Sequence, residues 1–193
     1  MKRRSAVKAM ALTSLSTPFF FSQGFTSIKK LLSTETIGFK SNWENWPDMK
    51  WIGPEFWGNR LQDWEISGGK ALCNISSSNR ALHILTHQLG SNTKDFQQSV
   101  LIDWKNQGLV GNAAVFGKGL DAGVTGTGQL MIGEKLSQEK LDLSKPIFLT
   151  LKSAFSSGKY SLTLSGSTAR NDKNSVELTA DGIAPGDLQG NLA

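Results

Sequence analysis

Two histidines four residues apart are the first candidates in this sequence for binding a metal ion. His83 and His87 are the only histidines in the chain. On an α-helix this spacing would bring both imidazoles to one zinc ion. The apolar residues around them favour a strand instead, in which four residues span roughly 13 Å, too far for a shared ion. The sequence therefore predicts two partly buried, hydrogen-bonded histidines, with a zinc site as the less favoured alternative.

Two glycine-rich stretches come close to nucleotide-binding motifs without completing them. The run Gly111–Lys118 has one residue too many between its glycines for a phosphate-binding loop, and Gly119 stands where that loop needs serine or threonine. The run Gly117–Gly123 misses the dinucleotide-binding spacing by one residue. These glycines are better explained as turns and close-packed strand ends. We therefore assign no catalytic residue, no metal ligand and no cofactor to this segment.

Five of the six tryptophans fall between Trp43 and Trp64. A buried indole removes about 150–250 Å² from water, so such a cluster is either core or an exposed stacking surface. Trp64 and Trp104 alternate with apolar residues, which predicts that both are core residues. Trp43 and Trp46 stand among polar residues, which makes these two the candidates for stacking on a ligand such as a glycan.

Short apolar runs separated by glycine turns indicate that strands must position these residues. Phe96–Trp104 places apolar side chains at every second residue, with Gln98 as the exception. The segment 61–66, the turn Ser67–Lys70 and the return run 71–75 predict a hairpin. Further strands are expected at 81–89, 112–116, 129–132, 147–152, 160–164 and 175–179. Only Lys135–Leu143 favours a short helical turn.

About nine short strands predict an all-β domain, arranged as a two-sheet β-sandwich or jelly roll. We assign this sandwich to residues 46–193 and expect it to be incomplete at its C-terminal end. Residues 28–45 show no clear pattern and are expected to form a linker.

The first 27 residues resemble a twin-arginine export signal. Arg3, Arg4 and Lys8 frame a basic start, and the following stretch Ala9–Phe21 is only moderately apolar. That stretch is too short and too polar for a stable membrane span. A disordered or helical leader is expected here, and the protein is expected to be exported to the periplasm or beyond. A merely disordered basic terminus is the alternative.

The charge and cysteine counts exclude several classes of protein. The chain carries 21 Lys+Arg and 16 Asp+Glu, but seven of the positive charges and one of the negative charges lie in residues 1–40. The remainder is therefore nearly neutral and lacks the basic field that nucleic acid binding needs. A single cysteine, Cys73, excludes an internal disulfide framework and a multi-cysteine metal site.

Three stretches together resemble the N-terminal region of exported PhoD-like alkaline phosphatases, which are metallophosphoesterases. They are Trp51–Trp64, Asn79–Thr86 and Ala114–Gly123. The resemblance implies a twin-arginine signal, a concanavalin/laminin-G-like sandwich and a phosphatase domain further along the chain. Gly186-Asp187 and Gly190-Asn191 match only fragments of the metal-binding signatures of that superfamily. None of the metal or catalytic residues of that family can be assigned here.

The expected function is therefore the non-catalytic sandwich region of a secreted phosphatase. Its partners would be the downstream domain of the same chain and the twin-arginine export machinery. Divalent metals are implied for the absent catalytic domain, and no nucleic acid partner is expected. A free-standing carbohydrate-binding module, with Trp43 and Trp46 as the stacking residues, is the alternative. A surface protein without a ligand is a third reading that the sequence leaves open.

Overall fold

A computed structural model describes residues 38–191 apart from 42, 76, 78, 92, 105–110, 117–119 and 169–174. The chain divides into two compact units, Met1–Gly38 and Phe39–Ala193, and all described residues except Gly38 lie in the second. The export-signal residues Arg3, Arg4 and Lys8 lie outside the described residues, as does most of the expected linker.

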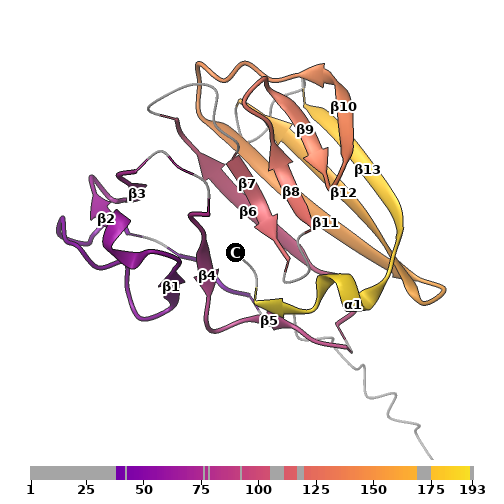
Figure 1. The fold of residues 1–193 in the computed structure, drawn as a ribbon, viewed down its shortest axis with the longest axis horizontal. Coiled ribbons are helices and arrows are strands. Elements are labelled where there is room, and N and C mark those ends of the chain that lie inside the picture. The colour runs from indigo at the N-terminus through magenta and orange to yellow at the C-terminus, as the bar shows by residue number, and fades with distance from the viewer. Residues whose placement is uncertain are drawn as a thin grey trace, which may run out of the picture. The chain divides into compact units, whose positions relative to one another are not determined.

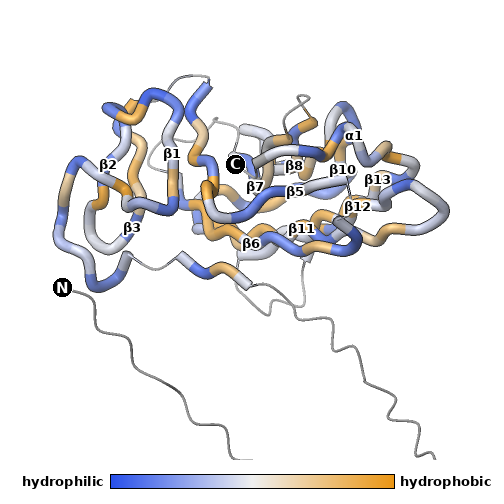
Figure 2. Tube along the Cα trace, turned by 90° about the horizontal axis from the view of Figure 1, so that it is seen from below, coloured by the Kyte–Doolittle hydropathy of each residue, from blue (hydrophilic) through white to orange (hydrophobic). Residues whose placement is uncertain are grey.

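Two four-stranded antiparallel sheets form the main body of this unit (Figure 1). The first sheet has the order β13-β12-β11-β6, with the bounds Val176–Ile183, Lys159–Ser167, Ile147–Ser156 and Gln97–Ile102. The second has the order β10-β9-β8-β7, with the bounds Lys135–Lys140, Gln129–Ile132, Asp121–Val124 and Gly111–Val115. In the turned view of Figure 2, β6 and β11 lie below β7 and β8. The prediction of an all-β, two-sheet sandwich is confirmed.

Alternating side chains build the core between the sheets. In β12, Tyr160, Leu162 and Leu164 are buried, while the hydroxyl residues between them are half-buried on the outer face. In β6 the residues alternate between exposed and half-buried along the whole strand, as its period-two pattern predicts. Gln98 is the polar exception on the inward face, and its Oε1 is buried with no hydrogen-bond partner among the described residues.

Shorter strands outside the two large sheets form two-stranded sheets. β1 (Phe56–Gly58) pairs with β4 (Leu82–Ile84), and β2 (Trp64–Ser67) forms a hairpin with β3 (Lys70–Cys73). β5 (Gln88–Leu89) pairs with β14 (Gly190–Asn191), which follows the short helix α1 (Pro185–Leu188). No helix in the described part of the chain is long and apolar enough to cross a membrane.

Three sequence predictions about individual elements are wrong. Lys135–Leu143 contains the strand β10 rather than a helical turn; only Ser137 of this edge strand is buried, so no alternation marks it in the sequence. The expected strand at 81–89 is two strands, because β4 pairs with β1 whereas β5 pairs with β14. The first predicted hairpin strand begins at Trp64, after a 3₁₀ turn over Leu61–Asp63.

The glycine-rich stretch that was predicted to form turns and close-packed strand ends supplies a strand of the second sheet. Gly123 lies within β8, opposite Asn112 of β7. A Cβ atom at Gly123 would lie 2.4 Å from the carbonyl oxygen of Gly111 and 2.6 Å from the Cα of Asn112. Both contacts are with backbone, so this strand pair requires glycine for close approach.

Candidate functional site

The two histidines lie on different elements and face different aromatic rings. His83 is in β4, where its ring centroid lies 5.2 Å from the indole of Trp57. His87 follows β4, lies 5.4 Å from the ring of Phe39, and shares a 2.9 Å hydrogen bond with the hydroxyl of Thr86. Within the described residues, no group of three or more His, Cys, Asp and Glu side chains could hold a metal ion.

The antiparallel pair β1–β4 carries the most exposed aromatic side chain of the site. Trp57 is directly opposite His83 in the register of the two strands. The backbone hydrogen bond from Leu85 N to Glu55 O, at 2.8 Å, extends the ladder by one pair. Because strand side chains alternate, Glu55, Trp57, His83 and Leu85 share one side of the ribbon. We call these four residues the ribbon face.

The opposite side of the same ribbon is packed. The ring of Phe56 lies 5.1 Å from the indole of Trp43 and 5.8 Å from the ring of Phe39. Gly58 is buried, and a Cβ atom there would meet the side chains of Leu61 and Trp64 at 3.2 Å. The packing of this side therefore holds the ribbon in place and leaves its other face open.

A polar framework joins the ribbon to the neighbouring hairpin. Arg80 and Asp63 form a 2.8 Å ion pair in which the side chains are only 12% and 14% exposed. The carboxamide of Asn59 donates to the side chain of Asn79 at 2.7 Å, and the Trp64 indole donates to the Asn59 carbonyl at 3.2 Å. These bonds fix the chain that follows Trp57 to the segment that leads into β4.

The exposure of the tryptophans differs from one indole to the next. Trp43 is half-buried, and its Nε1 donates to the carbonyl oxygen of Ile52 at 3.0 Å. Trp46 is half-buried and lies over Gly53, with its ring 5.9 Å from that of Trp51. Trp57 and Trp51 are the exposed indoles of the described chain, at 52% and 49%.

These exposures bear on each role expected for the tryptophans. The stacking role of Trp43 and Trp46 stays a prediction, and Trp57 was not among the residues predicted to bind a ligand. No local pattern in the sequence could have revealed Trp57, because its exposure follows from the inward packing of its neighbours Phe56 and Gly58. Trp104 packs against the sandwich core as predicted, and Trp64 is half-buried against Gly58.

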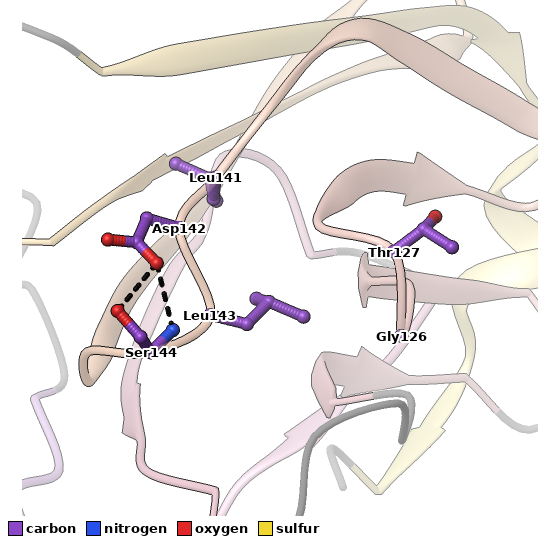
Figure 3. A pocket seen from close by; sticks show the side chains of 6 residues that line it. All are labelled: Gly126, Thr127, Leu141, Asp142, Leu143 and Ser144. Atoms are coloured by element: carbon purple, nitrogen blue, oxygen red, sulfur yellow. Dashed lines mark hydrogen bonds between the residues drawn. The ribbon is translucent and has the colours of Figure 1, made fainter.

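The hollow in Figure 3 has a volume of about 250 Å³ and lies between the β8–β9 turn and the segment that connects β10 to β11. Its lining comprises Gly126, Thr127 and the segment 141–144. The Asp142 carboxylate accepts bonds from the Ser144 hydroxyl at 2.6 Å and from the Ser144 amide at 3.0 Å. These bonds lower the pKa of Asp142 below its usual value. The carboxylate therefore stabilises the turn in which it lies, and no other titratable residue of the described chain lines the hollow.

No known protein family matches this chain, and neither does any curated protein or solved structure.

Proposed function

We propose that this chain is the non-catalytic N-terminal β-sandwich region of an exported PhoD-like alkaline phosphatase. The observation that supports the proposal is the way the residues of the resemblance associate. Two of the three stretches that carry it, 51–64 and 79–86, are separated in sequence but form one hydrogen-bonded substructure.

Polar side chains of the two stretches make the contacts within this substructure. Asp63 of the first stretch pairs with Arg80 of the second, and Asn59 of the first bonds to Asn79 of the second. The third stretch, 114–123, contributes to the β7–β8 pair, where Gly123 allows the close approach of the strands.

In this proposal the segment contributes scaffolding or substrate targeting, while the chemistry is supplied elsewhere. Hydrolysis of a phosphoester by a metal pair needs a cluster of histidine, aspartate and asparagine ligands. The resemblance places that cluster in a downstream domain, together with its divalent metals. The leader containing Arg3, Arg4 and Lys8 would direct the protein through the twin-arginine route to the periplasm or the extracellular space.

The proposal is tested by assaying the purified 193-residue chain and by reading the gene beyond codon 193. We expect no hydrolysis of p-nitrophenyl phosphate above the protein-free rate with zinc, calcium, iron or manganese added, with circular dichroism showing a folded β protein. We also expect the continuing reading frame to encode His and Asp metal-binding motifs. Metal-dependent turnover by this chain would contradict the non-catalytic role, and a frame without such motifs would contradict the phosphatase assignment.

A free-standing carbohydrate-binding module is the second candidate, favoured by the exposed aromatic residues of the described chain. Exposed indoles present an apolar face with a polar edge, which suits recognition surfaces. A glycan array separates this candidate from a purely structural role.

A further inference from the structure

We propose that the ribbon face binds a sugar ring of a neutral polysaccharide, with the indole of Trp57 as the stacking platform. This inference does not depend on the proposal of a phosphatase region, and it deepens the second candidate function by naming the residues and the ligand class of a binding site. It rests on the exposure, the packing, the charge and the size of the face formed by Glu55, Trp57, His83 and Leu85.

Exposure distinguishes the ribbon face from the rest of the substructure. Trp57 is 52% exposed and Leu85 is 48% exposed, while Phe56 on the opposite side packs against two aromatic rings. The one ribbon therefore buries one set of apolar side chains and presents another to solvent. The flat face of an indole and the C–H face of a pyranose are complementary apolar surfaces, so stacking would remove both from water.

The platform is also held in place before any ligand arrives. His83 lies against the indole with a centroid separation of 5.2 Å and an interplanar angle of 44°. Gly58, next to Trp57, is enclosed by the side chains of Leu61, Trp64 and Leu82. A side chain already ordered loses less conformational entropy on binding than a free one, which favours even a small ligand.

The polar groups of the ribbon face suit hydroxyl groups rather than a charged partner. Glu55 is exposed and lies two residues before Trp57 on the same side, at roughly 7 Å along the strand. Its carboxylate can accept hydrogen bonds from sugar hydroxyls, and the imidazole of His83 can donate or accept one. The face contains no lysine or arginine, so an anionic ligand such as a phosphate or an acidic glycan would meet only repulsion from Glu55.

The small area of the ribbon face suits a single sugar ring better than a protein partner. β1 and β4 have three residues each, which corresponds to a platform of roughly 10 Å by 5 Å. A stable protein interface buries about 800 Å² on each partner, far more than these four side chains present. One sugar ring within a longer chain fits an area of this size.

The experiment is calorimetric titration of the purified chain with neutral hexasaccharides of glucose, N-acetylglucosamine, xylose and mannose. The variant is W57A, and the matched control is W51A, which removes an indole of nearly equal exposure outside the ribbon face. We expect at least one neutral hexasaccharide to bind. We expect W57A to weaken that binding by about tenfold or more and W51A to change it by less than about twofold. W57F, which keeps a ring, should retain an intermediate affinity.

Four outcomes would overturn the proposal. They are the absence of binding across the panel, unchanged binding in W57A, loss of binding in W51A instead, and preferred binding of an anionic hexasaccharide of uronic acid. Near-ultraviolet circular dichroism of each variant separates a loss of the site from a loss of the fold. None of these results depends on phosphatase activity, so failure here is distinguishable from failure of the proposed function.

Discussion

The imidazole of His83 lies against the indole of Trp57, and this position affects its protonation. His83 is partly removed from water beside Trp57, and this burial lowers the pKa of its imidazole below the usual 6.5. The neutral form, which can both donate and accept a hydrogen bond, is therefore favoured at neutral pH. Glu55 is the other titratable residue on the same side of the ribbon, since Trp57 and Leu85 carry no ionisable group.

The lowered pKa of His83 predicts that the free energy of unfolding decreases as the pH falls below about 6.5. In that range the unfolded chain binds more protons than the folded chain, so protonation favours unfolding. The decrease should be small, because the imidazole is only partly buried. Urea unfolding at pH 7.5, 6.5 and 5.5 measures it. H83Q should lose part of the decrease; equal slopes in the wild type and H83Q would contradict the assignment.

At the scale of elements, the local sequence pattern was informative where burial alternates from one residue of a strand to the next. β6, β9 and β12 follow the alternation of their sequences, and β9 has the bounds 129–132 that the sequence predicts. β10 was missed because an exposed edge strand needs no apolar alternation.

The candidate site was harder to predict than the sandwich. β1 is three residues long, too short for a periodic signal, and its partner β4 lies more than 20 residues away. Which side of such a ribbon is exposed depends on that pairing and on rings contributed by Phe39 and Trp43. The composition revealed a tryptophan cluster, but only the long-range contacts decide which of its members face solvent.

The ion pair between Arg80 and Asp63 should be the main polar connection between the β1–β4 ribbon and the β2–β3 hairpin. Both side chains are more than four-fifths buried, so R80A would leave a carboxylate without its cation. We expect R80A to cost about 3 kcal/mol in the free energy of unfolding. K70A provides the control, because Lys70 and Asp103 are 64% and 50% exposed, and it should cost less than about 1 kcal/mol.

Chemical denaturation of R80A, D63N, K70A and the double variant D63N/R80A measures these costs. The double variant should be less destabilised than the sum of its single changes, because removing both charges leaves neither one buried alone. A cost for R80A no larger than that for K70A would show that the pair is not a structural connection.

On the scale of the whole described unit, residues far apart in sequence complete one core. Leu89 of β5 and Leu188 of α1 belong to the same buried cluster as the inward side chains of the two sheets. α1 begins with Pro185, whose fixed φ suits the first helical position, and the pairing of β14 with β5 follows directly after it. The segments 88–89 and 185–191 therefore extend the core beyond the eight strands of the sandwich.

The burial of Leu188 predicts that L188A is strongly destabilising although the residue lies in a helix of only four residues. Leu188 is 2% exposed, so truncation would leave a cavity, and we expect a cost of about 2–5 kcal/mol in the free energy of unfolding. L101A is the matched control, because Leu101 lies in β6 of the sandwich but is 59% exposed, and it should change stability by less than about 0.5 kcal/mol. Thermal and urea unfolding of both variants would compare them. If L188A unfolds like the wild type, α1 is not part of the cooperative core, and the two sheets are stable without the segment that follows β13.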